Sequence, residues 1–228
     1  DYGDFVELGL ELSCPEAARL MLGEPWRPPV TEVVPGGQEP EYDGDAMEIL
    51  LRTRQEALAL LREPWPVGEA LTLLLLFGYH AQGILDGEAD APFEPEAALD
   101  GAAEFAKTGS KAELLHFFEG LEILTETWKM RLKSPQNGRW SEEIRRLALY
   151  GVERYWLQAV SDYDLVCRVK MVVISCLLVK ILGGDPVKTA QMYSKEIENS
   201  AENVEAILDA AYTHPAFTDV YLIRMLTN

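Results

Sequence analysis

Two short apolar runs limit what this chain can fold into. They cover residues 71–76 and 171–179. Each is far shorter than the roughly 20 residues that a membrane-spanning helix needs. Arg168, Lys170 and Lys180 bracket the second run. We therefore expect both runs to be buried core helices of a soluble domain, and we expect no association with a membrane.

Helical periodicity dominates the sequence after residue 43. Pro66, Ser110 and Ser141 are typical of helix starts, and Gly183 is typical of a helix end. No alternation of the kind that strands show follows residue 43. We therefore expect an all-α fold, an irregular bundle of about eight helices, with a short extended element near residues 5–12. The predicted helices lie at residues 46–61, 66–85, 95–107, 110–128, 144–160, 165–182, 187–197 and 204–211, before a terminal turn at 221–226.

A segment rich in proline and glycine divides the chain. Residues 23–44 contain five prolines, which exclude a regular helix. The sequence therefore predicts three parts. These are an N-terminal element at 1–22 that can belong to a neighbouring module, an acidic loop at 23–44 and a helical domain at 45–228.

The charge of the chain is acidic and unevenly distributed. The 228 residues include 38 acidic and 20 basic side chains, a net charge of -18. Residues 1–100 hold 21 acidic and 5 basic side chains, whereas the remainder hold 17 and 15. Such a surface repels nucleic acid, so general nucleic-acid binding is excluded. An acidic face can attract a basic protein, although a solvated surface that maintains solubility explains the same charge.

The familiar motifs of self-contained enzymes are absent from the sequence. It has no G-x-G-x-x-G, P-loop, H-E-x-x-H or Cys-x-x-Cys pattern. His80, His116 and His214 lie far apart in the sequence, so we expect structural or solvent-facing roles for them. Cys167 and Cys176 lie on opposite faces of one predicted helix, so we expect two buried thiols that share neither a metal nor a bond.

Cys14 has a different sequence context. In Ser13-Cys14-Pro15-Glu16 the serine and the glutamate can form a capping box, so the thiol is expected to face a helix N-terminus. That position favours the thiolate, and with it nucleophilicity or metal ligation. A cysteine that is merely tolerated in a helix cap is the alternative. Three cysteines cannot form an even disulfide framework, and we expect a reducing compartment.

Residues 10–22, Leu-Glu-Leu-Ser-Cys-Pro-Glu-Ala-Ala-Arg-Leu-Met-Leu, resemble a stretch of the flagellin lysine-N-methylase family. In that family Cys-Pro-Glu follows closely after an N-terminal cysteine-rich module. Residues 191–204 are similar to the closing helix of the family, and residues 162–182 resemble the apolar helix before it. Residues 71–85 fit more loosely.

The resemblance implies methyl transfer from S-adenosylmethionine to lysine ε-amines of flagellin in the bacterial cytoplasm. It also implies an iron-sulfur cluster in the cysteine-rich part, to which Cys14 would contribute a ligand. The cysteine-rich module is absent from this sequence, so we expect no cofactor on this chain alone. We therefore expect the chain to be the C-terminal portion of such a protein and to be inactive by itself.

A lysine amine must lose its proton before it attacks a methyl group, so a methylase needs carboxylates or tyrosines beside it. A solvated helix face with pairing between neighbouring turns also explains such residues. Two functions stay open. One is the helical region of a protein-lysine N-methyltransferase that acts on flagellin or another lysine-bearing protein, and the other is a non-enzymatic acidic domain that binds a basic protein. The candidate site residues are Glu16, Arg19, Tyr193, Glu196, Glu198 and Asn203.

Overall fold

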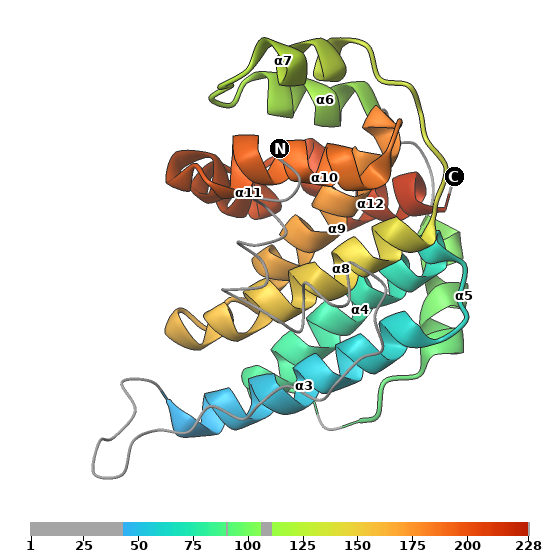
Figure 1. Cartoon of the computed structure of the whole chain (residues 1–228). Helices are drawn as coiled ribbons and strands as arrows, with labels where there is room; N and C mark the ends of the chain where they lie inside the picture. Colours follow the sequence, from blue (N-terminus) through green and yellow to red (C-terminus); the bar gives the residue numbers. More distant parts are fainter. Residues whose placement is uncertain (1–42, 90, 106–110, 228) are drawn as a thin grey trace.

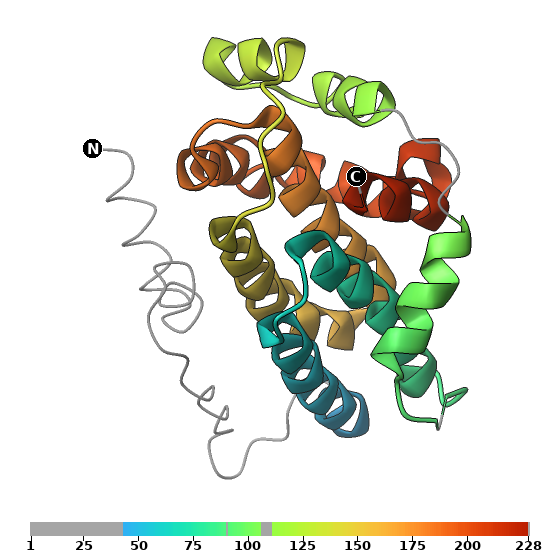
Figure 2. The ribbon, with the colours of Figure 1, turned by 90° about the vertical axis from the view of Figure 1, so that its right-hand side faces the viewer.

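The computed structural model describes residues 43–89, 91–105 and 111–227. All regular structure in these residues is helical, which confirms the all-α prediction (Figures 1 and 2). The described part has ten α-helices rather than about eight. They are α3 (Gly44–Arg62), α4 (Val67–Leu85), α5 (Pro95–Phe105), α6 (Lys111–Glu119), α7 (Glu126–Lys133), α8 (Glu142–Tyr155), α9 (Leu165–Leu182), α10 (Pro186–Tyr193), α11 (Ala201–Thr213) and α12 (Asp219–Leu226).

Three shorter helical segments connect some of these helices. The segments η1 (Trp156–Ser161) and η3 (Pro215–Phe217) are 3-10 helices, and η2 (Ser194–Glu198) is a single π-helical turn. The extended element expected near residues 5–12 lies outside the described residues, as do residues 1–22 and nearly all of the loop at 23–44.

Helix α9 is the central helix of the domain. It packs against α4, α8, α10, α11 and η1 (Figure 1). Seventeen of its 18 residues are buried, as expected for a helix that is apolar on all sides. The side chain of Asp164 caps its start, and Gly183, with φ 70°, ends it in a conformation that favours glycine. Its bounds agree with the predicted helix at 165–182.

Two basic side chains of α9 are buried, and each pairs with a carboxylate nearer the surface. The Lys170 ammonium donates to the carbonyl of Ala211 at 2.9 Å and lies 3.1 Å from the Asp219 carboxylate. The Arg168 guanidinium pairs with Asp162 at 2.8 Å. Since a buried charge is costly unless it is paired, these contacts explain how a core helix carries two cations.

The predicted helix at 110–128 is wrong as a single element. Helix α6 ends at Glu119, and α7 begins after Thr125, whose hydroxyl accepts a hydrogen bond from the Trp128 N–H. The intervening residues instead bond to the C-terminal part of the chain. The Glu122 N–H and carbonyl bond the Asn203 amide at 3.0 and 2.9 Å, contacts that a continuous helix would prevent.

None of the described helices combines the length and the apolarity that crossing a membrane requires.

Candidate functional site

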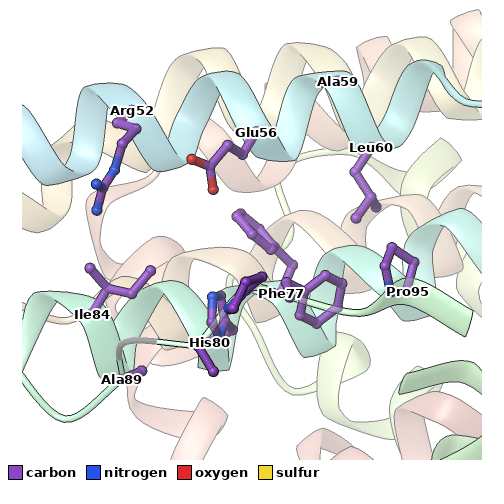
Figure 3. A pocket seen from close by; sticks show the side chains of 12 residues that line it. Arg52, Glu56, Ala59, Leu60, Phe77, His80, Ile84, Ala89 and Pro95 are labelled. Atoms are coloured by element: carbon purple, nitrogen blue, oxygen red, sulfur yellow. The ribbon is translucent and has the colours of Figure 1, made fainter. Parts of the chain in front are cut away.

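A groove of about 640 Å³ lies between α3 and α4, and residues 89 and 91–95 close one of its sides (Figure 3). Its volume falls in the range of pockets that bind small ligands or single side chains. The residues that line it are Arg52, Glu56, Ala59, Leu60, Phe77, His80, Ile84, Ala89, Ala91, Pro92, Phe93 and Pro95.

Helix α3 supplies the charged wall of the groove. Arg52, Glu56 and Leu60 follow one another at four-residue intervals, so they share one helix face. Figure 3 shows all three side chains pointing from α3 toward α4, with the Glu56 carboxylate above Phe77 and His80. Arg52 and Glu56 are both exposed, and the described residues form no ion pair with either of them.

Aromatic rings form the opposite wall. The ring centroids of Phe77 and Phe93 are 5.2 Å apart in an edge-to-face arrangement, and those of His80 and Phe93 are 5.6 Å apart. Phe77 also stacks on Trp156 of η1, at 6.1 Å, which anchors it to the core. These mutual contacts fix the rings before any ligand arrives.

The surroundings of the groove are acidic. Residues 43–105 carry 13 acidic and 3 basic side chains. Exposed Glu88 precedes the closing segment, and exposed Glu94 lies within it. A carboxylate above fixed rings can hold a long basic side chain, because the aliphatic stem packs on the rings and the cationic head meets the carboxylate.

Four candidate residues from the C-terminal part of the chain lie together around η2, where they contact other parts of the protein. They are Tyr193, Glu196, Glu198 and Asn203. The Glu196 carboxylate, 1% exposed, accepts hydrogen bonds from the Leu124 N–H at 2.7 Å and from the Thr125 hydroxyl. Asn203, 2% exposed, also donates to the carbonyl of Glu196 at 2.8 Å. These bonds hold the segment between α6 and α7 against η2, and they leave both side chains occupied.

Tyr193 and Glu198 lie on the other side of η2. The Tyr155 hydroxyl donates to the Glu198 carboxylate, and the Arg154 guanidinium donates to that hydroxyl at 3.0 Å. Burial, and then the negative charge of Glu198, raises the pKa of Tyr155 and of Tyr193 well above the ordinary value. Both tyrosines therefore keep their protons at neutral pH. The cavity beside them has no room for a water-sized ligand.

The cysteines divide into two groups. Cys14, together with Glu16 and Arg19, lies outside the described residues. Cys167 and Cys176 are buried in α9, and burial raises the pKa of each thiol to about 12. No three histidine, cysteine or acidic side chains of the described part converge on a point where a metal ion could bind. This part of the chain therefore does not fit an iron-sulfur cluster.

Sequence reasoning missed the groove residues. Glu56 is not among the candidates from the sequence, and His80 was expected to be structural or solvent-facing. A signal was present, because Arg52, Glu56 and Leu60 on one helix and Phe77, His80 and Ile84 on the next repeat at helical spacing. The spacing alone does not show that these two helix faces lie opposite each other.

Comparison with known proteins identifies no relative of this chain, since no family model, no curated protein and no solved structure matches it.

Proposed function

We propose that this helical domain docks a lysine-bearing segment of a protein partner in the groove between α3 and α4. The domain serves there as the docking region of a protein-lysine N-methyltransferase that acts on flagellin in the bacterial cytoplasm. The resemblance of residues 10–22 and 191–204 to the flagellin lysine-N-methylases supports the assignment of this docking region to a methyltransferase. S-adenosylmethionine and the iron-sulfur cluster then belong to the complete protein with its cysteine-rich module.

One observation carries the docking step. The Glu56 carboxylate, unpaired with any described cation within 4.0 Å, lies above Phe77 and His80 (Figure 3). Phe93 lines the same groove and contacts both of these rings. A lysine can place its four methylenes on these rings and its ammonium beside the carboxylate. The acidic surface around the groove attracts a basic segment before contact.

A different observation favours the second function, a non-enzymatic domain that binds a basic protein. The tail residues expected to handle a lysine amine are engaged in the interior, where Glu196 and Asn203 hold the segment between α6 and α7. Docking in the groove is common to both functions, and methyl transfer separates them.

The docking step is tested by titrating the chain with a fluorescent lysine-rich flagellin peptide. Glu56→Gln is expected to weaken binding about tenfold, because a charge-assisted contact contributes roughly 1.5–3 kcal/mol. Glu48→Gln, an exposed change on the same helix outside the groove with the same change in net charge, is the matched control and is expected to change binding less than about twofold. Equal affinities of the two variants would refute docking at Glu56.

The methyl-transfer step is tested by the intact mass of flagellin co-expressed with the complete gene, against an empty-vector control. Added methyl masses that disappear with Cys14→Ala support the methyltransferase. Unmodified flagellin, with the complete protein folded and its cluster loaded, refutes this step. Peptide binding that still depends on Glu56 then identifies the non-enzymatic domain.

A further inference from the structure

A second concavity, of about 460 Å³, lies at the C-terminal end of α9. Lys180 and Ile181 of α9 form one wall, and residues 137–140, from the connection between α7 and α8, form another. Lys111, the first residue of α6, and Met225 of α12 complete it. Four parts of the chain that are distant in sequence therefore meet around a space of small-ligand size.

Among the described residues that line this concavity, every charged side chain is a cation. Lys111, Arg139 and Lys180 line it, and no carboxylate is among the described residues that do so. None of the three forms an ion pair with a described carboxylate within 4.0 Å. In a chain with a net charge of -18, three neighbouring cations that no described carboxylate pairs with are an exception that favours an anion.

The Lys180 ammonium is held in place by an aromatic ring. Its nitrogen lies 4.9 Å from the centroid of the Trp140 ring. Burial, and then the positive charge of Lys111, lowers the pKa of Lys180 from its ordinary value. A bound anion would relieve that repulsion, since it attracts both ammonium groups.

The backbone around the concavity is fixed. The N–H groups of Gln136, Asn137 and Gly138 donate to the carbonyls of Leu182, Ile181 and Lys180 at 3.0, 3.0 and 2.8 Å. A Cβ at Gly138 would lie 3.1 Å from the Lys180 carbonyl oxygen, a tight contact, so the close approach favours glycine. The Lys111 ammonium donates to the Asn137 side chain at 2.6 Å, which positions it at the same rim.

We propose that this concavity binds the phosphate group of a small molecule, with Lys111, Arg139 and Lys180 as its ligands and Trp140 as the residue that positions Lys180. A phosphate dianion matches the site because a guanidinium can donate two parallel hydrogen bonds to its oxygens and two ammonium groups balance its charge. The site is independent of the groove between α3 and α4.

The experiment is calorimetric titration of the chain at constant ionic strength with inorganic phosphate and, separately, with glycerol 3-phosphate. We expect saturable binding, weakened about tenfold by Arg139→Gln and by Lys180→Gln, since each removes a charge-assisted contact. Lys188→Gln, an exposed lysine outside the concavity, is the control for net charge, and we expect less than a twofold change. Circular dichroism confirms that each variant is folded.

The two probes distinguish the source of the phosphate. Tighter binding of the ester identifies a phosphorylated small molecule, whereas equal binding identifies free phosphate. Trp140→Leu is expected to weaken phosphate binding about threefold while leaving the fold intact, because a cation–π contact contributes about 0.5–1 kcal/mol. Absence of saturable binding by the folded protein, or equal affinity of Arg139→Gln, Lys180→Gln and Lys188→Gln, would overturn the proposal.

Discussion

Thr125 and Glu196, which are 71 residues apart in the sequence, are joined by a hydrogen bond from the threonine hydroxyl to the glutamate carboxylate. The second oxygen of the same carboxylate accepts from the Leu124 N–H at 2.7 Å. One buried carboxylate on the π-helical turn thus fixes the start of α7, and through it the position of α6 and α7 on the bundle.

Glu196→Ala is expected to lower the free energy of unfolding by about 2 kcal/mol, because it leaves the Leu124 N–H and the partly buried Thr125 hydroxyl without this acceptor. Chemical denaturation followed by circular dichroism measures the change. Glu205→Ala, an exposed change on α11, is the control and should stay within about 0.5 kcal/mol of the unmodified chain. A similar loss in both variants would contradict the role of Glu196.

The buried ion pair of Arg54 and Glu153 links α3 to α8 at 3.5 Å, with both side chains less than a tenth exposed. Arg54→Met alone is expected to lower the free energy of unfolding by about 3–5 kcal/mol, because it leaves a buried carboxylate without this partner. The double variant Arg54→Met with Glu153→Met is expected to recover most of that loss. Additive losses in a double-mutant cycle would show that the pair is not coupled.

How far the fold follows from the sequence depends on which interactions end each helix. The bounds of helix α9 were predicted correctly because local signals mark both of its ends. The polar residues before Leu165 mark its start, and Gly183 marks its end. The break between α6 and α7 was missed because its cause is non-local. The apolar residues Leu121 and Leu124 continue the helical spacing, whereas bonds from the residues between the two helices to Asn203 and Glu196 help to separate α6 from α7.

The candidate site likewise depends partly on local signals and partly on non-local contacts. The sequence offered Tyr193, Glu196, Glu198 and Asn203 as candidates because they are close together along the chain, and in the structure they lie around η2. It did not predict that α10 would continue into a π-helical turn, which aims Glu196 at Thr125 and Glu198 at Tyr155. A π turn depends on packing at that point, so periodicity alone does not reveal it.

Tyr193→Phe is expected to stabilise the protein by about 1 kcal/mol at pH 7, because the buried Tyr193 hydroxyl has no hydrogen-bond partner in the described part of the chain. Thermal unfolding of the two proteins measures this difference. Tyr155→Phe is a control for which the opposite change in stability is expected. Its hydroxyl bonds both Glu198 and Arg154, so its loss is expected to destabilise. A destabilised Tyr193→Phe variant would contradict the assignment of an unpartnered hydroxyl.

The same substitution changes the response to alkali. The pKa of Tyr193 is raised in the folded protein, so between the ordinary pKa of about 10 and that raised value the unfolded chain has lost a proton that the folded chain keeps. Stability therefore falls as pH rises through this window, by about 1.4 kcal/mol per pH unit for one proton. Tyr193→Phe should reduce that slope between pH 10 and pH 11, measured by denaturation at several pH values.

The three thiols are expected to differ in reactivity. Burial raises the pKa of Cys176 to about 12, so its thiolate fraction at pH 8 is on the order of a thousandfold below that of a free cysteine. Cys167 behaves likewise. Since the sequence context of Cys14 favours its thiolate, iodoacetamide should modify the native chain once, at Cys14, and the denatured chain three times, as read by intact mass. Cys14→Ser should abolish the native modification, and rapid labelling of Cys176 would contradict its burial.

Arg52 provides a test of whether the ligand in the groove carries a positive or a negative charge. Its guanidinium lines the groove one helical turn from Glu56, so it repels a basic side chain and attracts an acidic one. If a lysine occupies the groove, Arg52→Gln is expected to tighten the binding of a lysine-rich peptide by about two- to fivefold, as for a single exposed charge. The fluorescence titration that tests Glu56→Gln measures this change.

Acetylation of the peptide lysines should remove the effect of both substitutions, because it removes the positive charge with which Glu56 and Arg52 interact. Weaker binding of the lysine-rich peptide to Arg52→Gln would instead mean that Arg52 attracts the bound segment, so no lysine ammonium lies beside it, and the docking proposal would fail.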